Sequence, residues 1–408
     1  MSRRSFLRIL TCLLFLVMVF SVSACTPEDL LNAIMTTTTT TSATTTTTAG
    51  TGTPSAPTNT TTTTTSSAPT QPSQPSAPTE PTTPPEPPAY YTITWKDELG
   101  ETLGTTRVFP DDVPSYAYQK QNTSEWEYLF KGWSDSRGGK VLKELPAATE
   151  DATYYASVER HEAGSMKVEF FGTSHGTPSD IRYSSSVVIE MNGSRYIFDV
   201  GAPVADILIR KHYDYSTIRG VFITHMHGDH VNGLPNLVDV SQWKSESKYT
   251  VYLPEQGGID MLNAYNLATN RLTSFYKNRI TLSHYEEGLI YEDENLKVTA
   301  VRVDHVKGMD TYGFLVEGGG KRVYITGDMS YDMHDFPELL YDIELDMIIT
   351  ELAHQQPADM LEHLKKCNIK TICLTHISPL EKGQQLIDMS GFLGNRMIIV
   401  EDNQILYP

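Results

Sequence analysis

The C-terminal part of the chain, residues 166–408, alternates short apolar runs with turns rich in Gly, Ser and Asn. The runs carry mainly β-branched and aromatic residues, and this composition predicts strands. Several runs, among them residues 397–400, are apolar at every position, which is typical of strands buried on both faces. Residues 204–212, 234–240 and 259–267 have helical character. We therefore expect an α/β fold in which helices cover the sheets.

A separate β-rich module is expected over residues 90–160. Residues 91–95 alternate in character, and residues 152–158 are again rich in residues that favour strands. The step Phe130-Lys131-Gly132-Trp133 and the run Asp151-Ala152-Thr153-Tyr154 resemble the Listeria–Bacteroides (internalin B-type) repeat, a β-grasp-like surface module. The module has no cluster of candidate ligands, so a spacer is the simplest role, and a stabilising or binding role stays open.

Residues 1–24 have the layout of an export signal. Three arginines precede an apolar run over residues 9–22, which is shorter than a spanning helix requires, and small residues precede Cys25. The sequence Val22-Ser23-Ala24-Cys25 resembles the lipobox of bacterial lipoproteins. That resemblance implies a lipid-modified (palmitate-bearing) Cys25 as mature N-terminus. The protein would then be anchored to the cell membrane and face outside the cytoplasm. An uncleaved anchor helix is the alternative.

Residues 25–89 are predicted to form a disordered linker. From about residue 36 they consist almost entirely of Thr, Pro, Ser and Ala. Such a segment cannot bury enough apolar surface to offset the entropy lost on ordering. We expect the linker to provide reach and no chemistry.

Charge and cysteine content narrow the function classes. The formal net charge is −18 at pH 7, which disfavours long-range attraction to polyanions and argues against a dedicated nucleic-acid binder. Of the four cysteines, Cys12 and Cys25 belong to the leader. Cys367 and Cys373 are expected to be buried thiols, because a disulfide-stapled secreted fold needs more cysteines.

The candidate chemistry begins at residues 221–230, where an apolar strand runs into three histidines and an aspartate. We expect the strand to end there and to place His225, His227, Asp229 and His230 on one tight turn, with Gly228 supplying backbone freedom. Imidazole nitrogen and carboxylate oxygen suit Zn²⁺, Mn²⁺ or Fe better than Ca²⁺ or Mg²⁺. Isolated histidines are commonly core or surface residues, but this array indicates a metal site.

Three further ligand-type residues follow predicted strands: His305, Asp328 and His376. Loops at strand ends are where rigid scaffolds carry functional groups. Each alone would be an ordinary loop residue. Together with the first array they give enough nitrogen and oxygen ligands for two divalent cations, with positions left for water and substrate. Zn²⁺ is the first expectation, with Mn²⁺ or Fe as alternatives.

The array His225-x-His227-x-Asp229-His230, followed by His305, Gly327-Asp328 and Thr375-His376, resembles the metallo-β-lactamase superfamily. The resemblance covers residues 166–408, and the flanking motifs look most like the tRNase Z and phosphodiesterase branch. It implies an αββα sandwich. It also implies a ligand set in two halves: His225, His227 and His305 for one metal, Asp229, His230 and His376 for the other, with Asp328 bridging. By the same resemblance Asp199 is a buried structural carboxylate near the site.

The implied activity is hydrolysis by a metal-bridged hydroxide, with a phosphodiester as the expected substrate. Asp229 would both ligate and accept a proton, and His354 would protonate the leaving group. A surface histidine is the alternative for His354. His175 lies on a loop expected to approach the site, where it is a candidate for contacting substrate. His363, in a helix predicted over residues 357–366, is expected to face solvent.

The chain also departs from the tRNase Z pattern. No basic arm for tRNA is evident, because residues 312–316 pass through one Gly-rich turn directly to residues 322–328. An exported acidic protein would not meet tRNA precursors, so we expect a small or flexible phosphodiester. A lactone, thioester or other carbonyl ester hydrolase is the alternative among enzymes. A surface-binding protein with a structural metal is the alternative outside them, and a homodimer is left open.

Overall fold

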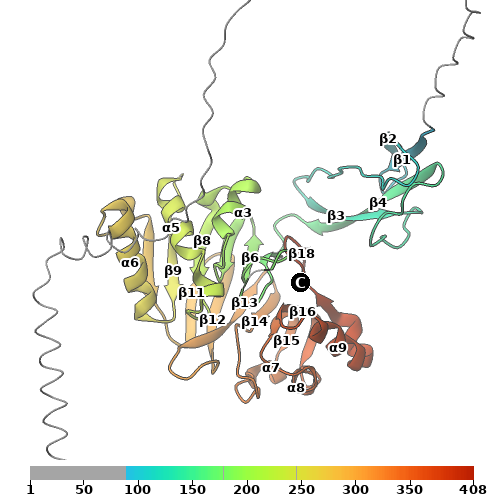
Figure 1. Ribbon diagram of the computed structural model, residues 1–408. Coiled ribbons are helices and arrows are strands. Elements are labelled where there is room, and N and C mark those ends of the chain that lie inside the picture. The colour runs from blue at the N-terminus through green and yellow to red at the C-terminus, as the bar shows by residue number, and fades with distance from the viewer. Residues whose placement is uncertain (1–88, 178, 245) are drawn as a thin grey trace, which may run out of the picture. The chain divides into compact units, whose positions relative to one another are not determined.

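The computed structural model describes residues 89–177, 179–244 and 246–408. The predicted export signal, Cys25 and nearly all of the predicted linker lie outside the described residues. The C-terminal part forms two seven-stranded sheets (Figure 1). The first has the strand order β10-β9-β8-β7-β6-β5-β18, and the second has the order β11-β12-β13-β14-β15-β16-β17.

The strands agree with most of the apolar runs. Those of the first sheet are β5 Lys167–Gly172, β6 Ser186–Met191, β7 Ser194–Phe198, β8 Ile218–Phe222, β9 Tyr249–Leu253, β10 Ile280–His284 and β18 Ile405–Leu406. Those of the second are β11 Gly288–Glu292, β12 Leu296–Val303, β13 Thr311–Gly318, β14 Lys321–Ile325, β15 Glu344–Leu352, β16 Asn368–Ile377 and β17 Met397–Ile399.

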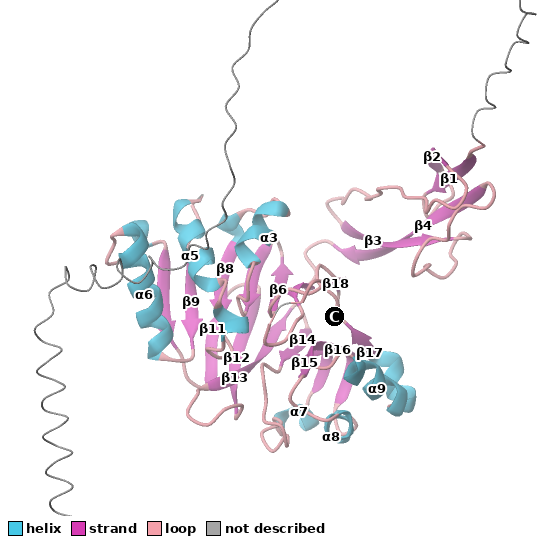
Figure 2. Ribbon diagram, viewed as in Figure 1, coloured by secondary structure: helices cyan, strands magenta, loops and turns pink. Residues whose placement is uncertain are grey.

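Helices cover the outer face of each sheet (Figure 2). One layer comprises α3 Val204–Arg210, α5 Leu234–Trp243 and α6 Gln256–Asn270, and the other comprises α7 Leu339–Asp342, α8 Pro357–Leu364 and α9 Glu381–Met389. A short helix, α4 Gly228–Val231, and the 3₁₀ turns η1 Tyr215–Thr217, η2 Tyr276–Asn278 and η3 Gly391–Arg396 lie in connections. Among the described residues no helix is long and apolar enough to cross a membrane.

Alternating side chains explain the layers. Phe222 at the end of β8 packs between the two sheets, whereas its neighbours Val221 and Ile223 pack against the first helix layer. In β16, Cys373 lies between the sheets, while Ile372 faces the second helix layer. In the central strands, runs that are apolar at every position are therefore buried on both faces, whereas Ile398 and Ile399 in the edge strand β17 are only half-buried. The predicted αββα sandwich is confirmed.

The β-rich module is a four-stranded sheet with the order β2-β1-β4-β3. Its strands are β1 Tyr91–Lys96, β2 Thr102–Val108, β3 Trp126–Ser134 and β4 Ala152–Glu162. The central pair β1 and β4 is parallel, and the two outer pairings are antiparallel. Trp95 is fully buried, and its ring centroid lies 4.7 Å from that of Trp133. The two tryptophans belong to a small hydrophobic core within this module.

His363 in α8 departs from the expectation of a solvent-facing side chain. Its Nδ1 lies 2.6 Å from the Tyr341 hydroxyl, and its ring centroid lies 4.8 Å from that of Phe336. The prediction was wrong because α8 packs this side of its surface against the segment around α7. Cys367 and Cys373 are both free thiols, and Cys373 is buried.

The sheets place several strand ends at one edge of the sandwich. In the second sheet β14, β15 and β16 are parallel, and β12 runs in the same direction because two antiparallel pairings separate it from β14. In the first sheet β7 and β8 are parallel, and β5 shares their direction by the same reasoning. The C-terminal ends of strands in each sheet are therefore gathered at one edge.

Candidate metal centre

The segment after β8 carries four of the candidate ligands. His225 lies in the connection, His227 immediately precedes α4, and Asp229 and His230 belong to α4 itself. The expected tight turn is thus a short connection followed by a helical turn. The prediction for Gly228 was wrong, since it is helical and has no positive φ. A Cβ at this position would lie 2.9 Å from the side-chain amide nitrogen of Asn232, so the glycine provides room.

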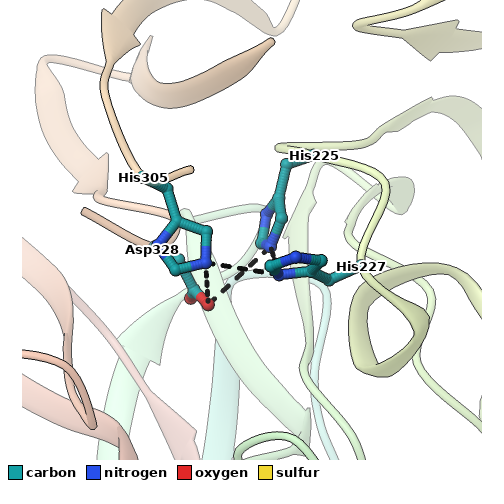
Figure 3. A group of neighbouring side chains, drawn as sticks. All are labelled: His225, His227, His305 and Asp328. Carbon is teal, nitrogen blue, oxygen red and sulfur yellow. Dashed lines mark hydrogen bonds and ion pairs between the residues drawn. The ribbon is translucent and has the colours of Figure 1, made fainter. Parts of the chain in front are cut away.

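The first ligand set consists of His225, His227, His305 and Asp328 (Figure 3). Nδ1 of His227 lies 3.1 Å from Nε2 of His225 and 3.3 Å from Nε2 of His305. Oδ2 of Asp328 lies 3.7 Å from both of these Nε2 atoms. All four donor atoms are within 4.8 Å of one another.

The second ligand set consists of Asp229, His230 and His376. Nε2 of His376 lies 3.0 Å from Oδ2 of Asp229 and 3.3 Å from Nε2 of His230. Asp328 lies between the two sets, because its Oδ1 is 3.5 Å from His230 Nε2 while its Oδ2 faces the first set. The structure therefore brings together all seven side chains singled out in the sequence.

The chemistry of these donors fits divalent cations. In the first set three imidazole nitrogens point at a common centre, and N–H groups facing one another at such distances would repel. Lone pairs directed inward, with a carboxylate beside them, are what a borderline-soft cation accepts. Imidazoles and carboxylates close the second set in the same way. The site is thus a candidate metal centre on its own geometry.

Buried groups behind the ligands fix their orientation. Oδ2 of Asp199 lies 2.7 Å from Nδ1 of His230, which leaves Nε2 of that ring for the site. Asp199 also accepts a 2.7 Å hydrogen bond from the backbone N–H of Thr224, whose hydroxyl lies 3.0 Å from Nδ1 of His225. Asp199 therefore lies behind the site as a supporting carboxylate.

Gly327 and His376 at the site both have left-handed backbone conformations. Gly327 has φ +62°, and a Cβ there would lie 2.7 Å from the carbonyl oxygen of Tyr312. Only glycine fits this close approach immediately before Asp328. His376 has φ +47°, and its backbone N–H donates to the Thr173 carbonyl at 3.1 Å. Left-handed non-glycine residues cost about 1–3 kcal/mol and persist where surrounding contacts hold them.

The pKa shifts divide the histidines. Burial lowers the pKa of His225 and that of His305, which keeps these rings neutral. Burial also opposes charge on His230 and His376, but the charge of Asp328 outweighs it, together with Asp199 at His230 and Asp229 at His376. The pKa of His230 is raised well above its usual value, and that of His376 is raised to about 10.

Glu351 is a candidate functional side chain that was not singled out in the sequence. It is buried at the end of β15, and its Oε2 lies 2.7 Å from Nδ1 of His354 and 3.8 Å from Nδ1 of His376. The signal was available, since Glu351 follows the apolar run 347–350 as directly as His305 and Asp328 follow theirs. Carboxylates of this kind orient a histidine and stabilise its charged form.

His354 lies over both ligand sets. Its ring centroid is 4.5 Å from that of His305 and 5.8 Å from that of His376, and its Nδ1 is 3.9 Å from Oδ2 of Asp328. Burial lowers its pKa, but the hydrogen bond and charge of Glu351 raise the pKa of His354 above its ordinary value overall. A half-exposed imidazole with a raised pKa thus lies beside the candidate metal centre.

The loop after β5 reaches the second ligand set. The backbone N–H of Gly176 donates to Oδ2 of Asp229 at 2.7 Å, and the His175 ring centroid lies 6.0 Å from that of His376. Burial lowers the pKa of His175, and the neighbouring His376 acts in the same direction. His175 is therefore close to the site without belonging to either ligand set.

A comparison with known protein families identifies the family to which the chain belongs. A family model described as Anti-Pycsar protein Apyc1 matches residues 166–389, more than half of the chain. The chain belongs to this Apyc1 family. The matched segment contains both ligand sets together with Glu351 and His354. The four-stranded module lies outside it.

The Apyc1-family chain is also similar to ribonucleases Z. It is 35% identical to ribonuclease Z of Listeria innocua over 155 residues, which cover 37% of this chain and 49% of that protein. For ribonuclease Z of Bacillus subtilis the identity is 31% over 180 residues, covering 43% and 57%. The chain spans about half the length of these curated relatives. These similarities, together with the candidate ligand sets, support a metal-dependent hydrolase of the metallo-β-lactamase superfamily.

Solved structures similar to this Apyc1-family chain include the short form of human tRNase Z and the metallo-beta-lactamase fold protein YhfI from Bacillus subtilis. The human enzyme gives a TM-score of 0.47 at 23% identity, over 60% of this chain and 100% of that chain. YhfI gives a TM-score of 0.49 at 18% identity, over 59% and 99%.

Proposed function

We propose that the protein is a two-metal phosphodiesterase that acts on a small or flexible phosphodiester. The observation that carries the proposal is the place of His354 over both ligand sets, with its Nδ1 held by Glu351 at 2.7 Å. A phosphodiester with a poor leaving group needs both an activated water and a proton donor. The site supplies candidates for the two requirements side by side.

Each ligand set would hold one divalent cation, with Asp328 shared and Zn²⁺ as the first candidate. Such cations, when bound, lower the pKa of water and neutralise charge on phosphoryl oxygens. Asp229 lies at the second set, where the Gly176 N–H fixes its Oδ2. Its carboxylate would take the proton of the attacking water.

His354 would complete the reaction by protonating the leaving oxygen. Its Nδ1–H donates to Glu351, so Nε2 is the atom that can transfer a proton. Glu351 raises the pKa of His354 and thereby stabilises the charged donor, although bound cations would oppose that shift. Half-exposure of His354 gives the leaving group access to the ring.

The cellular setting is part of the proposal. The lipobox-like sequence and the Thr/Pro/Ser-rich segment favour a lipid-anchored protein that works outside the cytoplasm. A net charge of −18 disfavours long polyanions but leaves one phosphodiester group acceptable once cations are bound. The module over residues 90–160 would serve as a spacer.

Turnover of methyl p-nitrophenyl phosphate and methyl phenyl phosphate tests the proposal. The full-length protein in detergent, loaded with Zn²⁺ or Mn²⁺, is expected to hydrolyse both. His354→Ala should slow the phenyl ester by about 10²–10⁴-fold, the usual size of general acid catalysis, and slow the p-nitrophenyl ester far less. The exposed His212→Ala serves as the matched control.

Two outcomes would reject parts of this proposal. Equal slowing of both esters would remove the donor role of His354. No turnover of either ester by protein that binds two metals per chain would reject the phosphodiesterase. Hydrolysis of a lactone or thioester by that same protein would then establish the carbonyl ester alternative.

A further inference from the structure

Lys382 contacts the turn that carries His354. It lies in the first turn of α9, which begins five residues after His376. Its ammonium group donates to the carbonyl oxygen of Ala353 at 2.8 Å and to that of Gln355 at 2.9 Å. These carbonyls belong to the two residues on either side of His354. The lysine therefore bridges the backbone directly across the candidate proton donor.

Helix formation does not explain this lysine. A cation in the first turn of a helix is unfavourable, because the N–H groups there carry partial positive charge. Half-burial adds to this cost, and burial lowers the pKa of Lys382 while the charge of Glu351 acts in the opposite direction. What offsets these costs is the pair of carbonyl hydrogen bonds. Lys382 therefore lies at a position that does not favour the stability of α9 but allows contact with the turn that carries His354.

The other contacts of the turn show what Lys382 adds. The backbone N–H groups of Ala353 and His354 donate to Oε2 of Glu351 at 3.2 and 3.3 Å. The buried Gln355 side chain donates to Oε1 of Glu351 at 2.8 Å. These bonds hold the turn from the side of β15. Lys382 holds its carbonyl groups from the side of α9, so the turn is fixed at both faces.

We propose that Lys382 is a positioning residue for His354, which locks the turn 353–355 so that the imidazole faces the leaving group. The proposal rests on the proposed function, because it assumes that His354 protonates a leaving group. It also links two loops at the site, since the segment that begins with the candidate ligand His376 continues into α9. Lys382 itself touches no candidate ligand atom.

The test compares Lys382→Met with Lys382→Arg in the full-length, metal-loaded protein. The methionine variant keeps the aliphatic stem and removes the donors. Its kcat for methyl phenyl phosphate should fall at least tenfold more than its kcat for methyl p-nitrophenyl phosphate, with KM unchanged. The arginine variant keeps charge and donors and should recover most of the loss. Lys365→Met, which removes an exposed lysine paired with Glu362, is the matched control.

Each result has a defined meaning. Equal loss on both esters, or no loss, overturns the positioning role. If Lys382→Met does not fold, Lys382→Gln replaces it and should show the same selective loss to a smaller degree; an unselective loss rejects the proposal. The His354→Ala variant separates the two levels. Selectivity in His354→Ala without selectivity in the Lys382 variants rejects only Lys382, whereas its absence in His354→Ala rejects the proton donor itself.

Discussion

The two ligand sets differ in how they hold positive charge. In the first set burial dominates and lowers the pKa values of His225 and His305, so these imidazoles present lone pairs. In the second set carboxylates surround His230 and His376 and raise their pKa values. Without a cation, the second set therefore holds its charge as protons. A cation at the first set would therefore add positive charge beside neutral imidazoles. A cation at the second set would instead displace protons from the histidines there.

Asp328 lies between the two ligand sets, so its removal should impair metal binding at both of them. Asp328→Ala is expected to lower kcat/KM by at least about 10²–10³-fold, the scale on which active sites lose an electrostatic element. Metal content measured by mass spectrometry should fall below two per chain. Asp388→Ala, at an exposed position in α9, should change neither quantity. Two metals retained by Asp328→Ala would contradict the shared role.

Asp199 contacts the second set directly, through His230, and the first set only through Thr224, so its substitution should weaken the two sets unequally. Asp199→Asn keeps an oxygen that can accept from the Thr224 N–H but loses the charge facing Nδ1 of His230. We expect a metal at the second set to lose about 10–100-fold in affinity, as for other carboxylates behind histidine ligands. Titration with a competing chelator measures both sites. Asp214→Asn, an exposed cap of η1, is the control, and equal weakening at both sites would refute the assignment.

A change of pH should alter the metal affinities of the two sets differently, with a smaller effect than that of the substitutions above. His376 has its pKa raised to about 10, so it carries a proton across the neutral range that a metal must displace. Affinity of the second set is therefore expected to rise with pH between about 6.5 and 10, while that of the first set, where the pKa values of His225 and His305 are lowered, stays nearly constant. Calorimetry in buffers of different ionisation enthalpy should show proton release for the second metal only. Release at the first metal instead would reverse the comparison.

The sequence predicted more of the site than of its surroundings. Each candidate ligand follows an apolar strand, and strand ends with the same direction meet at one edge, so convergence of His305, Asp328 and His376 could be expected. Glu351 satisfied the same rule and was missed because a lone carboxylate after a strand is common. His363 was misjudged because a helical position does not reveal which neighbouring segment covers it.

Some elements of the fold, among them β10, β11 and α9, were not predicted from the sequence, for similar physical reasons. The strands β10 and β11 have mostly half-exposed or exposed side chains, so their apolar pattern is weak. Helix α9 begins Glu-Lys-Gly-Gln-Gln, which is nearly all polar, and only tertiary packing of Leu386 reveals its buried face. Gly228 was assigned to a turn because glycine favours turns, whereas here it makes space for Asn232.

The ligands come from both sheets of the sandwich. His225 and His230 follow a strand of the first sheet, while Asp328 follows β14 of the second sheet and His376 lies in β16, and His230 and His376 are 146 residues apart in the chain. A cation held between them would close a long loop of polypeptide, as a disulfide does, and would cross-link the two halves of the fold. Binding of a cation would therefore oppose separation of the two sheets, and unfolding of either sheet would release the cation.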